Sequence, residues 1–107
     1  MNVNGKRTKF YFTDYVNHAI RFYLSSPDKI PVSGKSSASL KNWVAAQSVL
    51  YRLKPEELEI VKVIFDSKKQ IPGQVTAYCQ QTGADEMEIW NLVTGVVFRV
   101  AKARGLV

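Results

Sequence analysis

The stretch that decides the fold is Gln74–Leu92, QVTAYCQQTGADEMEIWNL. It has a small residue at Cys79, a glycine four residues later at Gly83, and apolar anchors at Ile89 and Leu92. A small residue lets two helices cross closely, and a glycine tolerates the positive φ of a tight turn. Apolar anchors at helical spacing hold the second helix against the first. The stretch therefore predicts a helix-turn-helix, with a first helix over 74–82 that stops at Gly83.

The second helix of this unit is predicted to begin after an N-cap at Asp85 and to run to Arg104. Glu88, at its third helical position, completes a capping-box arrangement. Two apolar faces follow from the helical spacing, one with Ile89, Leu92, Val93, Val96 and Val100, the other with Trp90, Val97 and Ala101. A helix that is apolar on two sides is central to a core or also packs against a second chain.

The residues before the unit predict three more helices. Lys54-Pro55-Glu56-Glu57 is a helix start, because proline suits the first helical position and glutamates suit the positive end of the helix dipole. This helix is expected to run to about Asp66, with Leu58, Val61 and Phe65 inward and a turn over 67–73.

Upstream, apolar residues at helical spacing predict a helix over 14–24 with Thr13 as its N-cap. The Ser, Pro and Gly content of 25–38 predicts a loop. A further helix is expected from an N-cap at Ser39 to Leu53, with one face formed by Leu40, Trp43, Val44, Gln47 and Leu50. The chain is thus predicted to be a single all-α domain of about five helices, divided into a basic and aromatic tail (1–12), two helices joined by a long loop (13–53) and the helix-turn-helix unit (54–107).

Composition narrows the class of protein. The chain has 107 residues, 46% hydrophobic and 22% charged, which is ordinary for one globular domain. No apolar run approaches the ~20 residues needed to cross a bilayer, and the N-terminal residues do not form a secretory signal. The lone Cys79 cannot form an internal disulfide, which favours a reducing compartment. We therefore expect a cytoplasmic protein that makes no membrane contact.

The sequence predicts no enzyme. It contains no P-loop, GxSxG, HExxH or dinucleotide-binding motif. One histidine and one cysteine, far apart in the chain, do not suggest a zinc site. We expect no catalytic residue, no metal and no cofactor.

The positive charge is concentrated in the first half of the chain. The net charge of +6 divides into nine basic and two acidic residues over 1–54, and six basic and seven acidic residues over 55–107. An anionic partner is therefore expected to meet the N-terminal half. The same charge also has a simpler interpretation, as a device for solubility.

The second half of the chain resembles sigma-factor region 4 of the sigma-70 family. The resemblance is carried by Leu53-x-Pro55-Glu56-Glu57, Ile60-Val61, Phe65, Tyr78-Cys79, Gly83-Ala84 and Ile89. It covers about residues 53–104, and it is shared with the small phage regulators of late transcription of the RinA and ArpU type. The resemblance implies a DNA-binding transcriptional regulator, of phage or mobile-element origin, whose last helix lies in the major groove of double-stranded DNA.

The candidate contacts follow from this placement. Lys6, Arg7 and Lys9 in the tail, with Arg99, Lys102 and Arg104 in the last helix, are candidate phosphate contacts. Glu86, Glu88, Asn91 and Thr94 are candidates for base readout, since carboxylates accept from cytosine N4 and asparagine pairs with adenine. For the acidic residues the competing interpretation is capping of the helix.

A second function is compatible with the same residues. The stretch 84–98 contains no lysine or arginine, which is unusual for a helix that approaches phosphates. In this interpretation the helix-turn-helix is a scaffold for binding RNA polymerase or another protein, or for forming a homodimer through the doubly apolar helix.

Overall fold

The part of the chain that the structure describes forms five helices. The computed structural model describes residues 11–30, 37–66 and 69–107. The helices are α1 (Thr13–Ser25), α2 (Ser37–Leu50), α3 (Pro55–Ile64), α4 (Ile71–Thr82) and α5 (Glu86–Arg104). No strand occurs in these three ranges. The prediction of an all-α fold with about five helices is confirmed.

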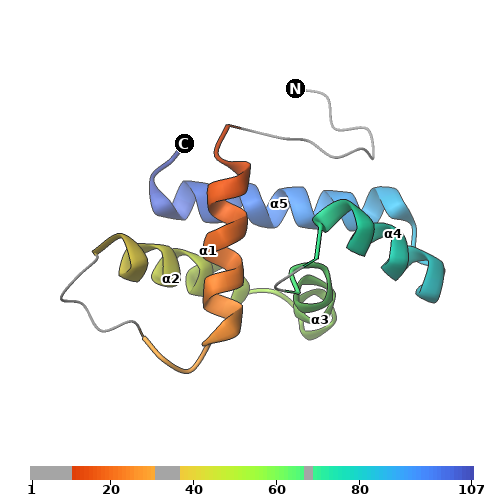
Figure 1. Ribbon diagram of the computed structural model, residues 1–107, viewed down its shortest axis with the longest axis horizontal. Helices are drawn as coiled ribbons and strands as arrows, with labels where there is room; N and C mark the ends of the chain where they lie inside the picture. Colours follow the sequence, from red (N-terminus) through yellow and green to blue (C-terminus); the bar gives the residue numbers. More distant parts are fainter. Residues whose placement is uncertain (1–10, 31–36, 67–68) are drawn as a thin grey trace.

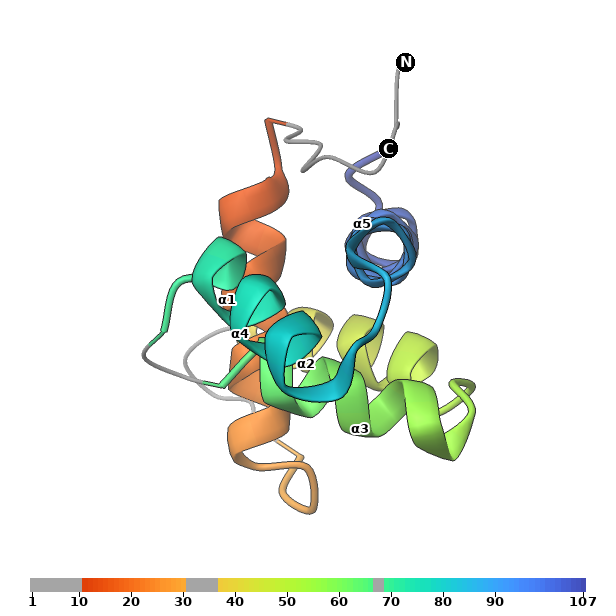
Figure 2. The ribbon, with the colours of Figure 1, turned by 90° about the vertical axis from the view of Figure 1, so that its right-hand side faces the viewer.

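The longest helix, α5, is the centre of the arrangement. Helices α1, α2 and α4 all contact α5, with the most extensive contact made by α2, while α3 packs chiefly against α4. Figure 1 shows α1 crossing α5 steeply, and Figure 2, which looks along α5, shows the other helices gathered to one side of it. The opposite side of α5 is exposed, with Glu88, Asn91, Arg99 and Lys102 along it.

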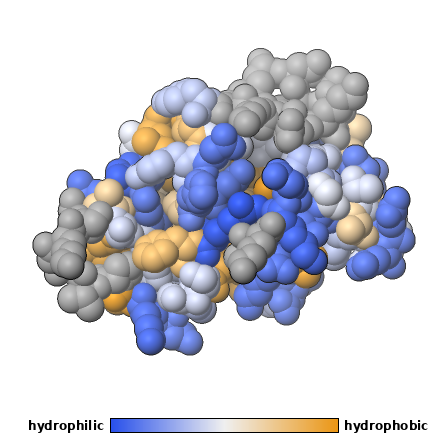
Figure 3. Space-filling view, viewed as in Figure 1, coloured by the Kyte–Doolittle hydropathy of each residue, from blue (hydrophilic) through white to orange (hydrophobic). Residues whose placement is uncertain are grey.

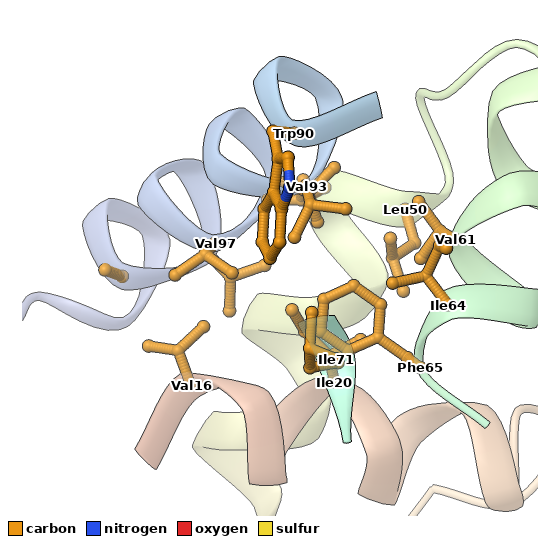
Figure 4. Packing of buried hydrophobic residues seen from close by; sticks show 14 of the residues in the cluster. Val16, Ile20, Leu50, Val61, Ile64, Phe65, Ile71, Trp90, Val93 and Val97 are labelled. Carbon is orange, nitrogen blue, oxygen red and sulfur yellow. The ribbon is translucent and has the colours of Figure 1, made fainter. Parts of the chain in front are cut away.

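Both predicted apolar faces of α5 are used inside the molecule. Its buried residues include Val93, Val96 and Val100 from one face and Trp90 and Val97 from the other. All five helices contribute to one buried cluster, part of which is drawn in Figure 4. The expectation that α5 is central to the core is confirmed.

Helix α2 differs from its prediction at both ends and in its buried face. It begins at Ser37 rather than after a cap at Ser39, and it ends at Leu50 rather than Leu53. Trp43 and Leu50 are buried as predicted, but Val44 is 47% exposed, and Ala45, Ala46 and Val49 are buried in its place. The reason is that α2 packs against both α1 and α5, so two contacts rather than one stripe determine which residues are buried.

Helix α4 begins three residues earlier than predicted. Its first residues are Ile71, Pro72 and Gly73, which the sequence reading placed in a turn. Proline in the first turn of a helix loses no hydrogen bond, because the first amides have no partner within the helix. The buried side chain of Ile71 then anchors this turn in the core.

The predicted helix caps are only partly correct. The residue at the N-cap of α1 is Phe12, not Thr13, and the buried Phe12 ring anchors that end instead. Asp85 does occupy the N-cap of α5, but its side chain makes no capping hydrogen bond, so the capping box with Glu88 is not formed. Acidic residues in the first turn of α5 still suit the positive end of its dipole.

None of the described helices is long and apolar enough to cross a membrane.

Candidate nucleic-acid interface

The turn between α4 and α5 is short and well hydrogen-bonded. Gly83 ends α4 with φ +75°, and its N–H donates to the Cys79 carbonyl at 2.9 Å. The Thr82 hydroxyl donates to the Tyr78 carbonyl at 2.7 Å and accepts from the Ala84 N–H at 3.2 Å. Only residues 83–85 separate the helices, which is the length typical of a helix-turn-helix. The turn therefore fixes where the first residues of α5 lie.

Four predicted contact residues lie along one exposed face of α5. Glu88, Asn91, Arg99 and Lys102 are all exposed, and at about 100° per residue they project to the side opposite the buried valines. Arg99 is positioned close to Gly95, because a Cβ added there would lie 3.7 Å from Arg99 Nη2. We call this surface the outer face of α5. Along it, charge changes from acidic near the start of the helix to basic near its end.

The other three predicted residues of α5 lie elsewhere. Glu86 lies beside α4, since its charge is one of the causes that raise the pKa of the Cys79 thiol. The largest cause is desolvation of Cys79, with Glu86 second and Asp85 third. Thr94 borders a cavity between α1, α4 and α5. Arg104 is partly buried and binds Asn42. The structure therefore does not bring these three residues onto the outer face.

Arg104 belongs to a small network that joins three helices. Its Nε donates to Asn42 Oδ1 on α2 at 2.6 Å, and Asn42 Nδ2 donates to the Tyr15 hydroxyl on α1 at 3.0 Å. These contacts lower the pKa of Tyr15, chiefly through the Asn42 hydrogen bond, with Arg104 adding a hydrogen bond and its positive charge; desolvation acts in the opposite direction. A structural role thus accounts for Arg104.

A basic residue that the sequence reading did not single out joins the outer face. Arg52, just after α2, borders the same shallow hollow as Arg99 and Lys102, with Ser48, Val49 and Ala103 between them. Within the described residues, Arg52, Arg99 and Lys102 make no hydrogen bond or ion pair with another side chain. We call these three residues the basic cluster. They come together because α2 packs on α5, which no spacing in the sequence indicates.

The remaining predicted phosphate contacts, Lys6, Arg7 and Lys9, lie outside the described residues. The described ranges contain ten basic and nine acidic side chains, so most of the +6 charge of the chain lies in the other segments. Tyr11, the first described residue, donates its hydroxyl to the Leu106 carbonyl at 2.6 Å. The Tyr11 side chain therefore lies beside the residues that follow α5.

The surface around these features is mixed. On the face viewed in Figure 3, hydrophilic surface predominates over α3 and α4, and hydrophobic surface forms smaller separate patches. In the described part of the chain, no three His, Cys, Asp or Glu residues come together in a way that could hold a metal ion.

The chain matches no protein-family model, no curated protein and no solved structure.

Proposed function

We propose that the chain is a DNA-binding transcriptional regulator that docks the outer face of α5 in the major groove of duplex DNA. Glu88 and Asn91 then meet base edges, and the basic cluster meets phosphates. The resemblance to sigma-factor region 4 and to phage late-transcription regulators supports this proposal and suggests a phage or mobile-element origin. Arg104, Thr94 and Glu86 have no part in it, because they lie off the outer face.

The observation that carries the proposal is the shared orientation of Asn91, Arg99 and Lys102. From Glu88 to Lys102 the helix rises about 21 Å, whereas the major groove is about 12 Å wide. The first part of the outer face can thus lie in the groove while its basic end reaches the phosphates at the edge. An acidic residue at the groove end is compatible with this, since Glu88 can accept a hydrogen bond from cytosine N4.

The test is fluorescence anisotropy with a random 30-base-pair duplex across a salt series. Each phosphate contact contributes about 0.9 to the slope of log affinity against log salt. For wild type we expect binding that weakens steeply with salt, and for the double variant Arg99→Ala/Lys102→Ala a slope smaller by roughly 2.

The matched control is Lys54→Ala/Lys62→Ala, which removes the same charge from the N-cap and the body of α3. Both lysines are exposed, and neither lines the hollow beside the basic cluster. If both double variants reduce the slope of log affinity against log salt by the same amount, DNA is bound through net charge alone and the proposed docking face is wrong.

A second candidate function is protein binding through the same surface. Met87 and Phe98 are 47% and 40% exposed on α5, and they flank Asn91. Exposed apolar side chains beside an acidic helix start suit a protein partner such as RNA polymerase. Both apolar faces of α5 are buried in the chain's own core, so dimerisation through them is not part of this proposal.

The two functions are distinguished by the same titration. A protein-binding module shows no duplex binding at low salt, and Phe98→Ser weakens its binding to purified bacterial RNA polymerase. A DNA-binding protein shows the salt-dependent duplex binding described above, whether or not Phe98 is present.

A further inference from the structure

A shallow groove runs along the seam between α2 and the second half of α5. It consists of two adjoining hollows, which share Ser48 and Ala103. One hollow lies between Leu40 and the end of α5, and the other lies between Val49 and Arg99, so the two helices run antiparallel along the groove. Figure 1 shows α2 beside this part of α5. From Leu40 to Val49 the groove is about 14 Å long, because a helix rises about 1.5 Å per residue.

The charged side chains that line this groove are all basic. They are Lys41 from α2, Arg52 from the turn after α2, and Arg99, Lys102 and Arg104 from α5. Neither α2 nor the stretch 89–104 of α5 contains an aspartate or a glutamate. Arg104 is bonded to Asn42, whereas the other four make no hydrogen bond or ion pair with another side chain in the ranges that the structure describes. The groove therefore presents positive charge that the fold itself does not neutralise.

The floor between these charges is apolar. Ala45 and Val49 are buried at its base, and Val44 is 47% exposed beside them. The one hydroxyl in the floor, that of Ser48, donates to the Ala45 carbonyl at 2.8 Å, so its proton is already used. Phosphates are bound by N–H and O–H donors and gain little from such a floor. The floor thus favours a partner that brings apolar side chains as well as negative charge.

Charge disfavours occupation of the groove by this chain itself. A second copy placed groove to groove would bring like charges together, which costs free energy. The segments 1–10, 31–36 and 67–68 contain five basic and no acidic side chains, so the same objection applies to them. The complementary partner is therefore an acidic segment of another protein.

We propose that this groove binds an acidic amphipathic helix of a partner protein. Apolar side chains on one face of that helix pack against Val44 and the floor, and carboxylates beside them meet Lys41 on α2 and Arg99 and Lys102 on α5. A groove about 14 Å long accommodates between two and three helical turns. The proposal goes beyond DNA binding and does not depend on it. Because the groove includes the basic cluster, the partner helix and a duplex would compete.

The probe for the test is a fluorescein-labelled synthetic peptide of leucine, alanine and glutamate, about 14 residues long, with its leucines at helical spacing on one face. The measurement is fluorescence anisotropy in the absence of DNA. We expect saturable binding that weakens with salt. A reference peptide of the same composition, with its leucines distributed around the helix, should bind roughly fivefold more weakly because it cannot place them together on the floor.

Two substitutions in the groove have matched controls on α3. Val44→Ser should weaken binding of the amphipathic peptide roughly fivefold, because an apolar contact is lost. Val63, which is 46% exposed on α3, provides the control Val63→Ser, and this variant should bind like wild type. Lys41→Ala should weaken binding by up to about fivefold at low salt, whereas Lys62→Ala should not. All four residues are exposed, and melting temperatures close to that of wild type show that the variants are folded.

Four results would overturn the proposal. The first is the absence of saturable binding of the amphipathic peptide, and the second is equal binding of the reference peptide, which would mean that charge alone acts. The third is equal weakening by Val44→Ser and Val63→Ser. The fourth is a Val44→Ser variant that binds duplex DNA more weakly but the peptide normally, which would assign the groove to nucleic acid. Failure of duplex binding by wild type would leave the peptide result intact, so the two proposals can fail separately.

Discussion

Two glycines have opposite effects on the stability of the fold. Gly83 has φ +75°, a conformation that L side chains rarely adopt, although the space beside it is open. Gly95 lies within α5, where a Cβ would meet only ordinary contact with Arg99. We expect Gly83→Ala to lower the free energy of unfolding by about 1 kcal/mol, and Gly95→Ala to raise it by roughly 0.5–1 kcal/mol. Urea denaturation of both variants measures this difference, and a change of the same sign in both would contradict it.

Among the described residues, Tyr15, Tyr23 and Cys79 contribute to how the stability changes at alkaline pH. Burial, followed by the negative charge of Asp28, raises the pKa of Tyr23, and desolvation leads the rise for Cys79. For both, the unfolded chain loses its proton first, so the free energy of unfolding falls as the pH rises past the unfolded pKa. Tyr15, whose pKa is lowered, adds stability in the folded state as the pH rises toward 10.

The expected outcome is a loss of stability between about pH 9 and 11. Over this range the free energy of unfolding of Tyr23→Phe should fall less than that of wild type, because the phenol whose pKa is raised by folding has been removed. The free energy of unfolding of Tyr15→Phe should fall more than that of wild type, because the phenol whose pKa is lowered by folding has been removed. Urea unfolding at both ends of this range measures each difference, and identical losses in the two variants would show that the linkage is misassigned.

The residues that sequence reasoning missed had no local signal. Lys41, a single lysine within a helix, fits the solvated face of an amphipathic helix equally well. It lines the groove only because the end of α5 lies across from it. Arg52 is likewise brought to Arg99 by the packing of α2 on α5. Contacts between residues so far apart in the chain depend on tertiary packing, which spacing does not encode.

At the scale of the helix, the two glutamates at the start of α5, Glu86 and Glu88, should differ in their effect on duplex binding. Both lie in its first turn, so replacing either with Gln removes a favourable interaction with the helix dipole and costs roughly 0.3–1 kcal/mol. Only Glu88 lies on the outer face of α5. We expect Glu88→Gln to tighten duplex binding at low salt by roughly two- to fivefold, because a like charge leaves the phosphates, and Glu86→Gln to leave it nearly unchanged.

Anisotropy measures the binding of both variants, and urea denaturation confirms that their stabilities match. Equal effects of the two substitutions on affinity would place DNA away from the outer face. If only Glu86→Gln binds more tightly, the DNA contact lies on the side of α5 that faces α4 rather than on its outer face.

Helices with strong start and stop signals were predicted well, and those without them were not. Pro55 begins α3, and Gly83 and Gly105 end α4 and α5 in the left-handed conformation. Helix α2 lacks such signals. Its buried face includes Ala45 and Ala46, and alanine is common on both buried and exposed helix faces, so the apolar pattern did not identify this face. In α4, the Pro72-Gly73 pair that usually marks a turn instead forms the first turn of the helix.

At the scale of the whole molecule, the charge that favours DNA lies mostly outside the described residues. We expect Lys6→Ala/Arg7→Ala/Lys9→Ala to reduce the salt slope of duplex binding by up to about 2.7, if all three residues contact phosphates. An unchanged slope would assign the electrostatic contact to the basic cluster alone.

The central place of α5 has a consequence for how the protein is made. Of the 21 buried hydrophobic side chains in the described ranges, seven belong to α5, which is synthesised after the other four helices. The first 85 residues therefore leave the ribosome with one side of their core uncovered, and the contact of Tyr11 with Leu106 forms only after α5 has emerged. The core is accordingly expected to form only once α5 is available, and a chain that stops at Asp85 should show little helical circular dichroism. Until α5 emerges, the nascent chain presents apolar surface that a chaperone can hold.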